Sequence, residues 1–296
     1  MNDIRNMAKQ AEAYLEKTGK LTEEALSKYI PDESSMPHTL HSAMRYATFA
    51  GGKRLRPGLA KAAYELFEGK QSEEIELAMC ALEMLHTFSL IHDDLPCMDN
   101  DDFRRGKPTT HKAYDEATAV LAGDALCIFA FELIARTGNA SVVEELARSL
   151  GTRGMIGGQI VDIESEGKAV DLATVDYIHY HKTAALIEAS LVIGALLANV
   201  KKEELTHIRE FGRGIGLVFQ IVDDILDIES STEELGKDVG SDIKNGKATY
   251  PAIMGVELSK QKAMEFYNES LECLEKLHGN TETLRNIAAL IIERTH

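Results

Sequence analysis

Several residue types are scarce in this sequence: it has no tryptophan, only six prolines and only four cysteines. The cysteines are widely spaced and form no Cys-x-x-Cys pair. The first residues, MNDIRNMAKQAEAYLEK, mix charges of both signs and lack the apolar segment of a signal peptide. In a chain without an export signal the cysteines are expected to be reduced thiols, and the protein is expected to be cytoplasmic.

Long apolar runs are also missing. The best candidate, 184–200, is interrupted by Glu188 and Asn199, whereas a membrane-spanning helix needs about 20 consecutive apolar residues. We therefore expect no stable insertion into a membrane.

Positive charge is in short supply, with 32 lysines and arginines against 48 acidic residues and a formal net charge of −16. A protein that binds nucleic acid needs a basic face to displace counterions from phosphate, so this balance argues against a nucleic-acid partner. An anionic substrate would need local basic residues or a bridging cation.

The hydrophobic pattern is helical almost throughout. Apolar residues recur every three or four positions in 75–91, 117–135, 142–156, 177–200 and 208–228. No series of alternating strands is evident, and no linker rich in proline, glycine or serine divides the chain. The pattern predicts an all-α protein with one domain over 1–296, in which apolar central helices are wrapped by amphipathic outer ones.

Two clusters of aspartates interrupt this pattern. The first combines Asp93, Asp94 and Asp99 with two further aspartates within ten residues. Carboxylates this close repel one another unless a cation holds them, and oxygen ligands suit Mg²⁺ or Ca²⁺. An EF-hand is excluded because the required glycine and glutamate are missing at positions six and twelve. The competing explanation is surface acidity.

The second cluster is Asp223, Asp224 and Asp227, with Gln220 one turn earlier, in an otherwise apolar helix. Asp223 and Asp227 are four residues apart and share one helix face. Three carboxylates in a buried helix are costly unless they are neutralised. The competing explanation is a structural salt-bridge patch.

Basic residues stand beside these clusters. The segment Gly51–Pro57, GGKRLRP, places three cations beside two glycines, and Arg104 and Arg105 follow the first aspartates. Glycine lets backbone N–H groups approach an anion, and arginine binds phosphate oxygens in a bidentate manner. GGKRLRP alone could equally be a solvated basic turn.

The combination resembles the short-chain polyprenyl diphosphate synthases, and most closely the bacterial farnesyl diphosphate synthases. The resemblance is carried by GGKRLRP, by LIHDDLPCMDNDDFRRGKPT at 90–109, by His181-Lys-Thr183 and by FQIVDDILD at 219–227. It covers nearly the whole chain in the family's order. The resemblance implies roughly ten or more helices around a deep central cavity (the isoprenoid synthase fold) and a Mg²⁺-dependent prenyltransferase of isoprenoid biosynthesis that is usually a homodimer.

The resemblance also implies roles for individual residues. Two aspartate motifs would hold the Mg²⁺ ions, about three per active site, through carboxylates and substrate phosphates. Lys182, Thr183 and Gln220 would lie near the allylic cation. The implied metal ligands are Asp93, Asp94, Asp99, Asp223, Asp224 and Asp227. The implied allylic diphosphate site is Arg104, Lys182, Thr183, Gln220, Lys237 and Lys247. The implied isopentenyl diphosphate site is Gly52, Lys53, Arg56, His86 and Arg105.

Product length is expected to depend on Phe88 and Ser89. Phe88 lies about 7–8 Å along the helix from Asp93. In the family an aromatic residue five positions before the first aspartate is typical of farnesyl diphosphate synthases, so Phe88 favours the C15 product. Because the helical wheel instead puts Ser89 below Asp93, a geranylgeranyl diphosphate synthase stays open. A class I terpene cyclase and a catalytically silent regulatory subunit of a prenyl synthase stay open as well.

Overall fold

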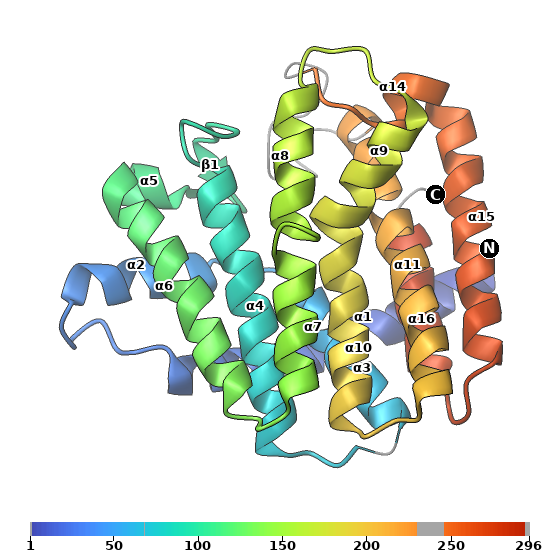
Figure 1. Ribbon diagram of the computed structural model, residues 1–296, viewed down its shortest axis with the longest axis horizontal. Helices are drawn as coiled ribbons and strands as arrows, with labels where there is room; N and C mark the ends of the chain where they lie inside the picture. Colours follow the sequence, from blue (N-terminus) through green and yellow to red (C-terminus); the bar gives the residue numbers. More distant parts are fainter. Residues whose placement is uncertain (1, 68, 230–245, 294–296) are drawn as a thin grey trace. The chain divides into compact units, whose positions relative to one another are not determined.

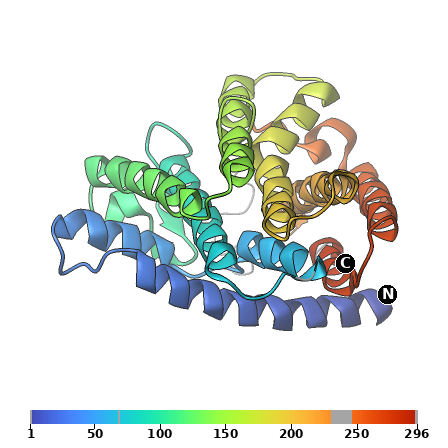
Figure 2. The same cartoon turned by 60° about the horizontal axis from the view of Figure 1, so that its bottom comes forward.

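The computed structural model describes residues 2–67, 69–229 and 246–293 (Figures 1 and 2). Its backbone forms two compact units, and each is described by itself. Unit 1 comprises Met1–Tyr14, Leu59–Lys70 and Ser141–His296, and unit 2 comprises Leu15–Gly58 and Gln71–Ala140. The expectation of a single domain over 1–296 stays a prediction.

Unit 2 is a group of helices with one small hairpin. Helices α1 and α3 cross the boundary between the units. The elements are α1 (Asn2–Tyr29), α2 (His38–Thr48), α3 (Leu55–Leu66), α4 (Glu73–Asp93), β1 (Phe103–Arg104), β2 (Lys107–Pro108), α5 (Thr110–Ala113) and α6 (Glu116–Ala135). The two strands pair antiparallel, with Arg104 opposite Lys107.

Helix α4 is the core of unit 2 and runs beside α6 (Figure 1). Its residues from Leu77 to Leu85 are all buried, which is the behaviour of a helix that is apolar on every side. Helix α6 is also apolar, but Leu121 is 58% exposed and Ile128 is 70% exposed. One face of α6 is therefore left uncovered by the residues that the structure describes.

Unit 1 is built around α11, which packs against α10 and α15 (Figure 2). A six-residue π-helix, η1, joins α9 to α10. The elements are α7 (Ala140–Leu150), α8 (Met155–Ser165), α9 (Leu172–Ile178), η1 (His179–Ala184), α10 (Ala185–Leu197), α11 (Lys202–Glu229), α14 (Tyr250–Met254), α15 (Val256–Glu275) and α16 (Glu282–Glu293).

Two glycines let neighbouring helices approach η1 closely. A Cβ on Gly158 of α8 would lie 2.2 Å from the backbone nitrogen of Lys182, and a Cβ on Gly216 of α11 would lie 2.5 Å from the Cβ of Ala184. Such distances exclude any side chain at either position. The π-helix, a form that occurs often at functional sites, is thus held between α8 and α11.

The all-α prediction is confirmed, with two local corrections. The apolar pattern over 142–156 predicted continuous helix, but the chain breaks at 151–154 between α7 and α8. Gly154 accounts for this, because a Cβ there would lie 2.0 Å from the carbonyl oxygen of Ser149. The hairpin β1–β2 was not predicted, since two-residue strands leave no alternating pattern.

Three helical segments are long and apolar enough, by length and composition alone, to cross a membrane: Glu73–Asp93, Glu116–Ala135 and Leu172–Leu197. The first and third bury 72% of their apolar window inside the protein, whereas the second buries 39%. Burial as extensive as that of the first and third is what core helices show. The expected absence of membrane insertion stays a prediction.

Candidate functional site

The glycine-rich loop of unit 2 lies against the hairpin arginine Arg105. The Arg105 guanidinium donates a hydrogen bond to the carbonyl oxygen of Gly51. A Cβ on Gly52, whose φ is +133°, would lie 2.6–2.8 Å from the Arg105 guanidinium. Gly52 is therefore favoured by its backbone conformation, and any side chain there would displace the Arg105 guanidinium from its present position. Two residues predicted to bind the same diphosphate, 53 positions apart in sequence, are neighbours in the structure.

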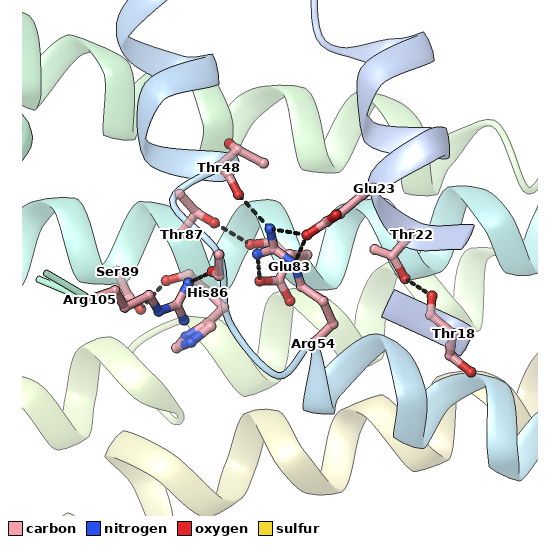
Figure 3. A network of polar contacts seen from close by, with 11 residues as sticks. Thr18, Thr22, Glu23, Thr48, Arg54, Glu83, His86, Thr87, Ser89 and Arg105 are labelled. Carbon is pink, nitrogen blue, oxygen red and sulfur yellow. Dashed lines mark hydrogen bonds and ion pairs between the residues drawn. The ribbon is translucent and has the colours of Figure 1, made fainter. Parts of the chain in front are cut away.

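His86 on α4 is surrounded by positive charge. Burial lowers its pKa well below the usual value, and the guanidinium groups of Arg56, Arg105, Arg104 and Arg54 lower it further. Figure 3 shows the His86 ring next to Arg105. A neutral imidazole can donate one hydrogen bond without adding a charge. Neutral His86 among guanidinium groups is the arrangement of an anion-binding site.

The first aspartate cluster lies at the end of α4. Asp94 is buried and accepts a 2.7 Å hydrogen bond from Nε of Arg104. Burial raises the pKa of Asp94 to about 6, against the opposing effect of Arg104. Asp93 and Asp99 are half-buried, and the amide of Asp99 donates to the carbonyl oxygen of Asp93. The loop thus folds back so that these two residues lie side by side.

A pocket opens in unit 2 between α2, α4 and the hairpin. Its polar wall contains Asp94, Arg104 and Arg105, and its apolar wall contains Ala50 and Leu90. The pocket therefore combines guanidinium groups with an apolar surface, as a ligand with a charged head and a hydrocarbon part requires.

In unit 1, Asp224 lies at the centre of a buried hydrogen-bond network. One carboxylate oxygen accepts from Nε2 of Gln220 at 2.8 Å. The other lies 3.3 Å from the amide nitrogen of Tyr250 and 3.2 Å from Nε2 of His179, whose pKa burial lowers to about 3. Thr183 donates a 2.6 Å hydrogen bond to Oε1 of Gln220. The network fixes Gln220 and Thr183 together.

Two of the predicted lysines meet at a residue that the sequence did not reveal. The Nζ atoms of Lys182 and Lys247 lie 2.6 and 3.1 Å from the same carboxylate oxygen of Asp162, which is buried on α8. Burial raises the pKa of Asp162, but the two lysines outweigh burial and the net pKa is lowered. The available signal was a single aspartate in a largely apolar helix, which is not specific.

The remaining predicted residues take the following places. Phe88 is buried on α4, with its ring edge-on to His92 at 4.9 Å between centroids. Ser89 donates to the carbonyl oxygen of His86. Asp223 is half-buried and Asp227 is buried on α11, while Lys53 is exposed. Lys237 lies outside the described residues.

The carboxylates of the aspartate motifs are oxygen donors, which is the ligand type that Mg²⁺ requires. Within residues 2–67, 69–229 and 246–293, no three histidines, cysteines or acidic residues converge as a ready-made metal site. Mg²⁺ does not need such a cage, because one or two carboxylates suffice when waters and substrate phosphates complete the shell. The half-buried carboxylates of Asp93 and Asp99 are ligands of the required type, and like Asp94 and Asp224 they already have partners within the protein.

Comparison with known proteins identifies the family. The family model "Polyprenyl synthetase" matches residues 37–288. A chloroplastic geranylgeranyl pyrophosphate synthase of Capsicum annuum is 53% identical over 81% of this chain and 67% of its own length. The geranylgeranyl diphosphate synthase of Cyanophora paradoxa is 45% identical over 96% of both chains. A heterodimeric geranylgeranyl pyrophosphate synthase large subunit of Arabidopsis thaliana, also named as chloroplastic, is 49% identical over 88% of this chain and 73% of its own length.

Solved structures agree with this. An FPP/GFPP synthase from Zymomonas mobilis superposes with a TM-score of 0.83 at 35% identity, over 96% of this chain and 99% of that one. A geranyltransferase from Helicobacter pylori, complexed with magnesium and isoprenyl diphosphate, superposes with a TM-score of 0.80 at 33% identity, over 96% of this chain and 95% of that one. The all-α isoprenoid synthase fold is confirmed.

Two expectations change. The prediction of a cytoplasmic location is wrong by this comparison, because the relatives from Capsicum annuum and Arabidopsis thaliana are named as chloroplastic. The farnesyl product is not specifically supported, and geranylgeranyl diphosphate agrees better with the relatives. Because the family model and these relatives span most of the sequence, the chain belongs to the polyprenyl synthetase family and is a prenyltransferase.

Proposed function

We propose that the chain condenses isopentenyl diphosphate with an allylic diphosphate, and that geranylgeranyl diphosphate is the product. The observation that carries the proposal is the cluster in unit 2 in which Arg105 binds the Gly51 carbonyl oxygen of the glycine-rich loop and lies next to His86 (Figure 3). Such a site can bind a diphosphate through direct hydrogen bonds and ion pairs. Isopentenyl diphosphate, which is proposed to bind without a metal ion, needs a site of this kind. The C20 product is supported by the names of the relatives from Capsicum annuum and Cyanophora paradoxa.

The isopentenyl diphosphate site is proposed to consist of Gly52, Lys53, Arg56, His86 and Arg105. The arginines bind phosphate oxygens in a bidentate manner, and Lys53 supplies a point charge. Gly52 gives backbone access, since a side chain there would displace the Arg105 guanidinium. Neutral His86 donates a hydrogen bond without repelling the arginines.

The allylic diphosphate is proposed to bind to Arg104, Lys182, Lys247 and Lys237, the last outside the described residues. The carbon–oxygen bond of this substrate breaks, diphosphate leaves, and an allylic cation forms. Mg²⁺, supported by the Helicobacter pylori complex, would supply positive charge to the leaving diphosphate. Asp162 holds Lys182 and Lys247 together before the substrate arrives.

The cation is proposed to lie near the oxygens of Thr183 and Gln220, whose positions the Asp224 network fixes. The double bond of isopentenyl diphosphate attacks the cation, a carbon–carbon bond forms, and one proton leaves. No protein side chain is assigned as the base, and the departed diphosphate accepts the proton. The reaction requires that water be kept from the cation, since water would trap it as an alcohol.

For the metal, Asp93, Asp94 and Asp99 in unit 2 and Asp223, Asp224 and Asp227 in unit 1 are the proposed ligands. All six carboxylates have partners within the protein, such as Arg104 for Asp94 and Gln220 for Asp224, and metal binding would replace these contacts. That the two motifs face each other across a deep cavity, and that about three Mg²⁺ ions bind through carboxylates and phosphates, remain part of the proposal.

A second candidate product is farnesyl diphosphate. The observation that favours it is Phe88, which is buried on α4 five residues before Asp93 and has a bulky ring. A ring in the path of the growing chain would stop elongation at C15. The FPP/GFPP synthase of Zymomonas mobilis shows that the fold also occurs in enzymes of that name.

A second copy of the chain is the proposed partner. The uncovered apolar face of α6, with Leu121 and Ile128, is the feature that a homodimer would bury. One relative is named as the large subunit of a heterodimer, so a smaller subunit is the competing partner. The mass of the purified chain in solution distinguishes a homodimer from a monomer that needs a partner.

Product analysis tests the proposed function. Purified protein is incubated with Mg²⁺, labelled isopentenyl diphosphate and, in separate reactions, each C5, C10 and C15 allylic diphosphate, and the dephosphorylated products are separated by chromatography. A dominant C20 product supports the proposal, and a dominant C15 product supports the second candidate. A cyclised hydrocarbon, or no product from any starter, contradicts both. The matched control is Asp93→Ala under the same conditions.

A further inference from the structure

The segment GGKRLRP contains three cations, and the side chain of the middle one, Arg54, is buried inside unit 2. Its side chain is 1% exposed, whereas Lys53 is exposed and Arg56 is half-buried. Its φ is +47°, a left-handed conformation that costs energy for a residue with a Cβ. Arg54 immediately precedes helix α3, and its carbonyl oxygen accepts a hydrogen bond from the amide of Gly58 in the first turn of that helix.

Three acceptors surround the Arg54 guanidinium. Nη1 donates to Glu83 at 2.6 Å, and Nη2 donates to Glu23 at 3.1 Å and to the carbonyl oxygen of Thr48 at 2.8 Å. Figure 3 shows Glu23, Glu83 and Thr48 converging on Arg54 from separate helices. The Glu83 side chain is only 2% exposed.

A buried ion pair of this kind is weak evidence for stability, because desolvation offsets much of the attraction. What it fixes is geometry. Glu83 lies on α4 one turn before His86, so an arginine bound to Glu83 ties the loop to the helix that carries His86. The left-handed backbone at Arg54 then sets the directions of Lys53 before it and Arg56 after it.

We propose that Arg54, anchored by Glu83, is a positioning residue that holds Lys53 and Arg56 at the correct distance from His86 for a diphosphate. This inference rests on the proposed function, since it names the isopentenyl diphosphate site as the one that is positioned. Arg54 itself does not contact the substrate, because its donors are taken by Glu83, Glu23 and Thr48.

The decisive variant is the double substitution Arg54→Met with Glu83→Leu. Arg54→Met alone leaves the Glu83 carboxylate buried without its arginine, and such a protein can fail to fold. The double variant replaces the pair by apolar side chains of similar volume, a change that proteins often tolerate. The thermal unfolding midpoint of the double variant is expected to lie within a few degrees of that of the parent protein, above that of Arg54→Met alone.

Steady-state kinetics on the double variant separates positioning from stability. The KM for isopentenyl diphosphate is expected to rise by about tenfold or more, because the phosphate-binding residues are no longer held. The KM for the allylic diphosphate is expected to stay within about twofold, since its proposed contacts to Lys182 and Lys247 do not involve this loop. A double variant that is folded and has the parent KM for isopentenyl diphosphate overturns the inference.

The double substitution Arg209→Met with Glu188→Leu is the matched control. Arg209 lies on α11 in unit 1 and pairs with the buried Glu188 and with Glu145, and Glu145 keeps its ion pair with Arg148 in this variant. This control is expected to leave the KM for isopentenyl diphosphate unchanged. A rise in that KM equal to the rise in the Arg54→Met, Glu83→Leu variant would show that any lost ion pair has this effect, and would also overturn the inference.

A binding measurement keeps the inference separate from the proposed function. Inorganic pyrophosphate is titrated calorimetrically into the parent and the Arg54→Met, Glu83→Leu double variant without Mg²⁺. One outcome is that no starter gives product, while pyrophosphate binds the parent and binds the double variant at least about tenfold more weakly. The proposed function is then wrong, but the positioning role of Arg54 is supported. If turnover is normal and both proteins bind pyrophosphate equally, the positioning fails and the function stands.

Discussion

The hydroxyl of Thr183, in the π-helix η1, donates a 2.6 Å hydrogen bond to the side-chain carbonyl of Gln220 on α11. Thr183→Val keeps the shape of the side chain and removes the donor. Loss of one buried hydrogen bond predicts a decrease in kcat of about tenfold, with the KM for the allylic diphosphate unchanged. Steady-state kinetics with Ser at position 183 is the control, because Thr183→Ser restores the donor and should restore most of kcat.

Asp162 is expected to control the allylic diphosphate site through its two lysines. Asp162→Asn keeps the volume and removes the negative charge between Lys182 and Lys247, which then repel each other. We expect the KM for the allylic diphosphate to change by about fivefold to tenfold, while the KM for isopentenyl diphosphate stays constant. Equal changes in both KM values would contradict the separate roles of the two sites.

The same residue predicts a pH dependence of stability. The folded-state pKa of Asp162 is below its usual value, so its stabilising contribution is complete above the unfolded pKa of about 4 and is lost as pH falls through the folded pKa. Urea unfolding of the parent and of Asp162→Asn between pH 7 and pH 3 measures this. The stability difference between the two proteins should shrink only below about pH 4; a difference that already disappears at pH 6 would contradict the lowered pKa.

His86 predicts a second pH effect, on substrate binding. Because its pKa lies well below the usual value of about 6.5, His86 stays neutral between pH 8 and pH 6. The KM for isopentenyl diphosphate in His86→Gln, relative to the parent, should then be constant over this range. A ratio that changes steeply near pH 6.5 would show that His86 titrates at its ordinary pKa and that the arginines do not act on it.

Phe88 is expected to limit the length of the product. Phe88→Ala removes a buried ring five residues before Asp93, and the space opened along α4 should allow further condensations, so the product distribution shifts to longer chains. Chromatography of the products from a C10 starter measures the shift. Ser89→Ala is the companion variant, because Ser89 is the other residue expected to set product length, and it separates the two positions. An unchanged distribution in Phe88→Ala would show that another residue ends the tunnel.

Much of the fold could be predicted from the sequence, because its signal is local. The apolar spacing of 75–91 and 117–135 predicted α4 (Glu73–Asp93) and α6 (Glu116–Ala135) to within two residues at each end. Each helix buries a face of its own sequence, so its periodicity is visible without its neighbours. The break at 151–154 was missed, because it lies in the non-helical backbone of Gly154, with φ −142° and ψ −137°, and the apolar repeat runs on across it.

The candidate site was only partly predictable. Aspartate and arginine clusters such as Asp93 and Asp94, or Arg104 and Arg105, are visible because their members are adjacent in sequence. Asp162 was missed because its partners Lys182 and Lys247 are 20 and 85 positions away. Charge pairs formed across such distances leave no local pattern.

The sequence alone determined the helical class, the two aspartate motifs, the basic loop and, through them, the prenyltransferase family. Its residue types and spacings carry this information because helix periodicity and diphosphate chemistry both act over a few neighbouring residues. The tertiary structure decided which of those residues are held and by what: Arg54 by Glu83, Gln220 by Thr183 and Asp224, and Lys182 by Asp162. A buried polar group must find its partner wherever packing places one, and only the folded chain brings those partners within hydrogen-bond distance.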